Sequence, residues 1–228
     1  FTENLGQVAG EGVLFHARGD GISVTFTPQG VDYVITRDTG RAEFHLRLGD
    51  RRAVTPVGQG PLGHRVNYLL GDDPSMWVRQ AATFESVLYE GVYPGVDVRF
   101  HFLDDMLKYD VIVAPGTDLD DVVLKYRGVD GLSVDPATGD LIIHTAAGPI
   151  RDARPVFLQE GLGTGVPGAY RLLGEGRFGF LAPEGVVNDV PTVIDPGIEF
   201  STLLVGSQYD EVLMVGVDPD GDIIVGGQ

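Results

Sequence analysis

The sequence predicts an all-β protein, and three observations carry that prediction. Apolar and polar residues alternate with period two, most clearly over 96–102, as expected for a strand with one apolar and one solvated face. The 228 residues include 33 glycines and 14 prolines, which punctuate short strands with turns. No window longer than about ten residues keeps a helical apolar stripe free of glycine and proline.

Each strand is expected to be short and to end at Gly, Pro, Asp or Asn. The predicted strands are 12–17, 21–27, 30–36, 42–48, 83–89, 96–102, 106–113, 121–126, 140–145, 168–173, 177–182, 198–205, 211–217 and 222–226. Turn sequences such as Asp38-Thr39-Gly40 and Ala137-Thr138-Gly139-Asp140 separate them and predict hairpins. The segment 49–63 lacks a β pattern and is predicted to be a long loop.

A domain boundary is predicted near Leu103-Asp104-Asp105. It divides the chain into a β-sandwich-like unit of mainly antiparallel strands over 1–104 and a second such unit over 105–200. Units of about 100 residues are common for β-sandwiches. Residues 201–228 are expected to form a separate C-terminal extension.

Composition and charge exclude several classes of function. Acidic residues outnumber basic ones 33 to 16, and the net charge of −17 opposes binding to nucleic acid. The absence of cysteine excludes disulfides and thiol catalysis. The sequence has no apolar run near the roughly 18 residues of a membrane span. Hydrophobic residues make up 43% of the chain, so a sizeable core can form.

Several ordered motifs resemble the N-terminal modules of bacterial and archaeal cell-surface proteins that carry SBBP-type β-propeller repeats. They are Phe1-Thr2-Glu3-Asn4-Leu5-Gly6-Gln7, Asn67-Tyr68 with Trp77, Val92-Tyr93-Pro94-Gly95-Val96-Asp97, Leu107-Lys108-Tyr109-Asp110 and Val193-Ile194-Asp195-Pro196. Residues 209–227 resemble one SBBP repeat, although Asp222 stands where the repeat often has Asn. The resemblance implies an exported, extracellular or cell-surface protein, and it brings no catalytic residues, so no enzymatic activity is expected.

A calcium site is the only cofactor hypothesis that the residues suggest. Asp218, Asp220 and Asp222 have the one-three-five spacing of a calcium loop. Ile223 replaces the glycine expected next, and no closing Glu follows. A plain Asp-Gly hairpin between Val215–Val217 and Ile223–Val225 explains the same residues, and we favour that interpretation.

Aromatic and acidic residues suggest carbohydrate binding or processing as an alternative function. Trp77, Tyr68, Tyr89, Tyr93 and Tyr109 are the candidates for a sugar-stacking platform, although a core position is the favoured interpretation for Trp77. Paired carboxylates are the requirement for glycoside hydrolysis, but no signature locates such a pair. Arg18-Gly19-Asp20 is interpreted as a hairpin turn.

The leading functional hypothesis concerns strand edges near the C-terminus. A single repeat cannot close a propeller, so its strands would expose unpaired backbone groups that another chain can pair with. The candidate assembly residues are Phe200, Leu203, Leu204, Val205, Ile223, Ile224 and Val225. The sequence therefore predicts a structural or adhesion protein, a filament or surface-layer subunit, that pairs with other copies of itself or with neighbouring surface domains. A monomeric spacer before a propeller is the other alternative.

Overall fold

The all-β prediction is confirmed by the computed structural model of the chain. The structure describes residues 1–19, 21–49, 53–103, 106–159, 165–199, 212–217 and 223–227. All strand pairs in these ranges are antiparallel, and their only helices are two short 3-10 turns, η1 (Pro74–Met76) and η2 (Leu119–Asp121). No helix in the described ranges has the length and apolar character to cross a membrane.

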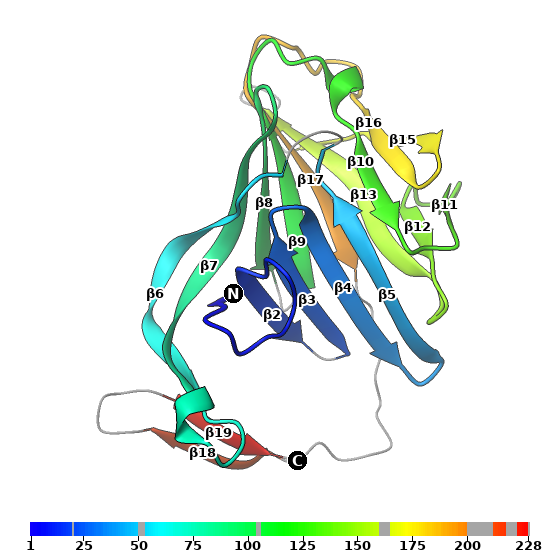
Figure 1. Cartoon of the computed structure of the whole chain (residues 1–228). Helices are drawn as coiled ribbons and strands as arrows, with labels where there is room; N and C mark the ends of the chain where they lie inside the picture. The colour runs from blue at the N-terminus through cyan, green and yellow to red at the C-terminus, as the bar shows by residue number, and fades with distance from the viewer. Residues whose placement is uncertain are drawn as a thin grey trace.

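The strands form one large, twisted sheet that curls into a nearly closed barrel (Figure 1). One half of it pairs in the order β15 (Ala169–Gly174), β16 (Arg177–Leu181), β10 (Leu124–Arg127), β5 (Gly40–Arg47), β4 (Gly30–Arg37), β3 (Ile22–Thr27), β2 (Phe15–Gly19) and β1 (Thr2–Glu3). This half includes strands from the beginning and from the end of the chain.

The other half pairs in the order β6 (Val57–Tyr68), β7 (Val78–Tyr93), β8 (Val96–Leu103), β9 (Met106–Val113), β17 (Thr192–Glu199), β13 (Ile150–Gln159), β12 (Leu141–His144) and β11 (Gly131–Val134). The short β14 (Val166–Pro167) also pairs with β13. The two halves join where Thr2 of β1 pairs with Thr83 of β7.

Alternation along the strands fixes which side chains face the interior. In β8, Val96, Val98 and Phe100 are buried, while the polar residues between them are more exposed. The register of β8 against β9 is continuous from Val96↔Val113 to Leu103↔Met106. The predicted strands at 96–102 and 106–113 are therefore confirmed.

One hydrophobic core fills the barrel. Its aromatic rings form a continuous row across β4, β5, β10 and β16: Tyr33 stacks on Phe44 at 4.9 Å, Phe44 contacts Tyr126 at 5.9 Å, and Tyr126 stacks on Phe178 at 5.3 Å between ring centroids. The predicted domain boundary falls between β8 and β9, at residues 104 and 105, which lie outside the described ranges. Strands from both sides of that boundary share this core and pair with one another, as β5 does with β10.

Several strands differ from the predictions. The predicted loop over 49–63 is wrong from Val57 onward, because β6 begins there and pairs with β7. No strand was predicted where β13, β11 and the two-residue strands β1 and β14 lie. The strand β17 begins at Thr192, earlier than the strand predicted over 198–205. Both β6 and β13 lack clean alternation: β6 contains three glycines and Pro61, whereas β13 places polar residues at 151, 152 and 154.

A two-stranded sheet of its own lies near the C-terminus and contacts β6. It consists of β18 (Val212–Val217) and β19 (Ile223–Gly227), and its register pairs Val215 with Val225 and Val217 with Ile223. The hairpin that the sequence predicted between these two segments is confirmed.

Candidate functional site

The structure describes only some of the residues predicted to form sites. Asp218, Asp220 and Asp222, the calcium candidates, lie outside the described residues, as do Phe200, Leu203, Leu204 and Val205 of the assembly set. Ile223, Ile224 and Val225 belong to β19, where they pair with β18. Within the described ranges, no three His, Cys, Asp or Glu side chains gather as a metal site would require.

The candidate residues for a sugar-stacking platform do not lie together on the surface. Tyr89 and Tyr109 are buried in the core, and their hydroxyls bond to Thr27 O at 3.0 Å and to Asp152 at 2.9 Å. The core position favoured for Trp77 is also wrong, since its side chain is only half-buried and lies next to η1. Its indole N–H donates to Gly71 O at 3.0 Å, and the Arg79 guanidinium lies 5.3 Å from the ring centroid.

The N-terminal motif organises a loop. The Asn4 amide donates to Val8 O and Val13 O, both at 3.0 Å, and its oxygen accepts from the backbone N–H of Val8. The Gln7 amide lies 3.2 Å from Nε2 of His16. Burial, with a smaller contribution from the charge of Arg18, lowers the pKa of His16 to about 4, so the ring is neutral near neutral pH. Asn4 therefore braces the loop after β1, and Gln7 links that loop to β2.

The motifs at 107–110 and 193–196 lie on the neighbouring strands β9 and β17. Lys108 of β9 and Asp195 of β17 form an ion pair at 3.2 Å. Asp110, two residues further along β9, pairs with Arg99 at 2.5 Å. Burial opposes ionisation of Asp110, but hydrogen bonds from His101 and Arg99 prevail and hold its pKa below the ordinary value. The resemblance motifs thus supply cross-strand ion pairs on the outside of the barrel.

A buried carboxyl group lies inside the core. Asp152 of β13 is fully buried and accepts hydrogen bonds from the hydroxyls of Tyr109 at 2.9 Å and Tyr126 at 3.5 Å. Its other oxygen has no hydrogen-bond partner. Burial raises the pKa of Asp152 to about 7, although the tyrosine hydroxyls act in the opposite direction. The group is closed to solvent, so we interpret it as a structural acid.

The β6–β7 hairpin, called the arm below, projects from the barrel (Figure 1). Among the described strands, β6 pairs with β7 alone, so its outer edge has no strand partner. The connection at the far end, residues 69–77, is the arm tip. Its exposed apolar side chains are Leu69, Leu70 and Met76, which are 43%, 65% and 73% exposed. Exposed apolar side chains grouped in this way are typical of contact surfaces.

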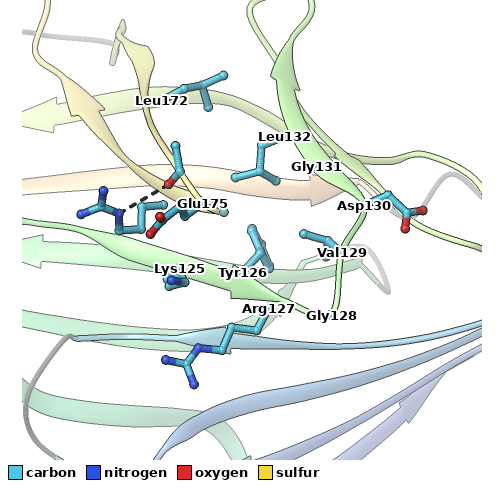
Figure 2. Close-up of a pocket in the computed structure, with 13 residues that line it drawn as sticks. Lys125, Tyr126, Arg127, Gly128, Val129, Asp130, Gly131, Leu132, Leu172 and Glu175 are labelled. Atoms are coloured by element: carbon cyan, nitrogen blue, oxygen red, sulfur yellow. Dashed lines mark hydrogen bonds between the residues drawn. The ribbon is translucent and has the colours of Figure 1, made fainter.

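A pocket marks the place where the barrel does not close. The strands β11 and β15 approach each other there, and in the described part of the sheet each pairs on one side only. The opening between them, called the seam pocket, has a volume of about 610 Å³. Figure 2 shows Val129, Leu132 and Leu172 around this opening. Leu172 is 41% exposed although it lies on the same face of β15 as the buried Tyr170.

The turn at the rim of the seam pocket has an unusual backbone. Glu175 and Gly176 connect β15 to β16, and both have positive φ, +54° and +74°. A two-residue hairpin of this kind favours Asn, Asp or Gly at both positions, so Glu175 is strained. A Cβ atom at Gly176 would lie 2.2 Å from Tyr126 O, so glycine is required there. The close contact fixes the turn against β10.

A row of positive charge borders the pocket. In the strand register, Lys125 of β10 lies opposite Arg47 of β5 on one side and opposite Arg177 of β16 on the other. Like charges directly opposite each other destabilise a sheet. The Arg177 guanidinium donates to Leu173 O at 3.2 Å, whereas Lys125 and Arg47 have no carboxylate partner among the described residues. We call Arg47, Lys125 and Arg177 the basic row.

The sequence model of one family, described as "Domain of unknown function (DUF7948)", matches residues 1–197. The chain belongs to this family. No curated protein and no solved structure matches the chain. The matched DUF7948 region ends within β17, so it contains the barrel, the arm and the seam pocket but not β18 and β19.

Sequence reasoning missed the features that stand out in the DUF7948 barrel. Asp152 could have been noticed because it lies two residues after Ile150, on the same face of the strand, where a period-two pattern predicts an apolar residue. The seam pocket and the basic row left no local signal, since their residues come from strands distant in the sequence.

Proposed function

We propose that this DUF7948 chain is a non-enzymatic extracellular structural or adhesion protein that assembles through β-strand contacts, with other copies or with neighbouring surface domains. The projecting arm carries this proposal. Its outer strand β6 has backbone groups that no described strand pairs with, and its tip exposes Leu70 and Met76. Part of β6 contacts β19, but the outer edge of β6 forms no strand pairing among the described residues, and such an edge suits a contact with another chain.

Two further features support the proposal. The motif resemblance to surface proteins with SBBP repeats implies export. Pro61 and a register shift between Pro61 and Arg65 interrupt the β6 edge, which is how natural edge strands limit uncontrolled pairing. An edge interrupted in this way favours a defined contact at the tip over indefinite sheet extension.

Sedimentation and electron microscopy of the full chain test the proposal. We expect concentration-dependent assembly, and we expect Leu70→Ser with Met76→Ser to weaken it. The matched control is Leu158→Ser with Leu181→Ser, which removes exposed apolar side chains from barrel strands (42% and 46% exposed). A wild-type chain that stays monomeric at all concentrations would refute the proposal and favour the spacer alternative.

Deleting residues 201–228 separates the arm from the C-terminal segment. If the arm suffices, the truncated barrel still assembles. If the predicted C-terminal residues carry the contact, assembly is lost while the melting temperature of the barrel is kept.

A further inference from the structure

The basic row is a charge arrangement that the fold itself does not explain. Lys125 lies between two arginines in an antiparallel register, in a chain whose net charge is −17. Acidic residues are abundant in this chain, which has 33 of them. A carboxylate in place of Arg47 or Arg177 would have stabilised the sheet, because it would lie opposite Lys125. Glu175 and Asp130 also line the pocket beside this row, but neither forms an ion pair with Lys125 or Arg47 among the described residues. Cations without an ion-pair partner are suited to an acidic partner.

The seam pocket beside this row provides an apolar cavity. Val129, Leu132 and Leu172 surround the opening, and Lys125 and Arg177 belong to its lining (Figure 2). A volume of about 610 Å³ lies within the range in which proteins hold ligands. A suitable partner therefore presents aliphatic side chains next to carboxylates.

The arm tip has this combination. Leu69 and Leu70 precede Asp72 and Asp73, and Met76 follows them; all five are exposed. Asp73 is occupied in capping η1, since its carboxylate accepts from Ser75 N at 2.9 Å. Asp72 has no such bond among the described residues, so its carboxylate is available to a partner.

We propose that the arm tip of one copy docks in the seam pocket of the next, with Leu70 and Met76 in the apolar opening and Asp72 against Lys125. The arm and the strands that border the pocket, β11 and β15, lie on opposite sides of the barrel (Figure 1). A contact between two different surfaces of identical chains repeats in one direction and forms an open string of copies unless a rotation closes it. This inference rests on the proposed function and specifies its partner surfaces.

Charge exchange at the two surfaces tests the inference. The variants are Lys125→Glu and Asp72→Lys, each measured alone and as an equimolar mixture by sedimentation velocity at low salt. Each variant alone should weaken self-association about tenfold, because like charges then meet at the contact. The mixture should recover wild-type association, because each variant's arm tip then meets the opposite charge in the other variant's pocket.

The melting temperature of each variant shows whether it still folds. Lys125→Glu places a carboxylate between Arg47 and Arg177, so its melting temperature should equal or exceed that of the wild type. Arg18→Glu is the matched control: Arg18 is exposed on β2, and its reversal changes the net charge by the same amount without touching either surface.

The outcomes distinguish the two proposals. A wild type that never associates refutes the proposed function. If the wild type associates, and Lys125→Glu associates equally well or the mixture does not recover, the docking inference alone is wrong and the arm has another partner. If Arg18→Glu weakens association as much as Lys125→Glu, net charge and not the basic row controls assembly, and the inference is likewise overturned.

Discussion

Replacing Asp152 with asparagine isolates the cost of holding a carboxyl group in this core. The side chain is fully buried, and burial is the largest cause of its raised pKa, about 7 against an ordinary 3.8. The folded protein therefore keeps a proton on Asp152 at pH values where the unfolded chain releases it. Asparagine has nearly the same shape and no charge, so it removes this proton linkage and keeps an oxygen for the Tyr109 hydroxyl.

The direction of the pKa shift of Asp152 determines how its contribution to folding stability changes with pH. Because the pKa is higher in the folded state, the Asp152 contribution to stability is fully present below about pH 4 and is lost as the pH rises to about 7. The difference between the two pKa values corresponds to about 4 kcal/mol once both states are ionised. The stability of Asp152→Asn relative to wild type should therefore increase by about 2–3 kcal/mol between pH 5 and pH 8.

Urea unfolding at pH 5 and pH 8, followed by circular dichroism, measures this difference. Asp130→Asn is the control, because it makes the same substitution at an exposed position. If Asp152→Asn shows the same pH dependence as wild type, then Asp152 does not hold a proton in the folded state and the reasoning from burial is wrong.

Three further predictions concern single contacts, each read out by thermal or urea unfolding. Gly176→Ala should cost about 2–4 kcal/mol, because its Cβ would lie 2.2 Å from Tyr126 O at a positive φ; a cost near zero would mean that the turn can move away. Glu175→Asn should gain about 0.5–1 kcal/mol, since asparagine tolerates a φ of +54° better; a loss would show that the Glu175 carboxylate stabilises the rim. Asn4→Ala should cost about 2 kcal/mol and speed proteolysis within residues 5–13, because the amide holds that loop through hydrogen bonds at 3.0 Å; unchanged proteolysis would contradict this role.

Strands with local signals were predicted correctly from the sequence, and those without them were not. The alternation in β8 reports burial on one face, and the turns before Gly30 and Gly40 mark the ends of hairpins, so these elements can be found from neighbouring residues alone. The strand β6 escaped prediction because most of its length lies outside the core and has no buried face to impose a pattern. The strand β13 escaped because Asp152 takes an interior position, which reverses the expected polarity.

The sequence by itself determined the all-β class and the C-terminal hairpin, because period-two alternation and turn chemistry act between residues close along the chain. Only the tertiary structure decided the arm, the seam pocket and the basic row. Lys125 meets Arg47 and Arg177 through antiparallel pairings between strands far apart in the sequence. Such pairings depend on how the whole sheet curls and where it fails to close, and no local pattern records either.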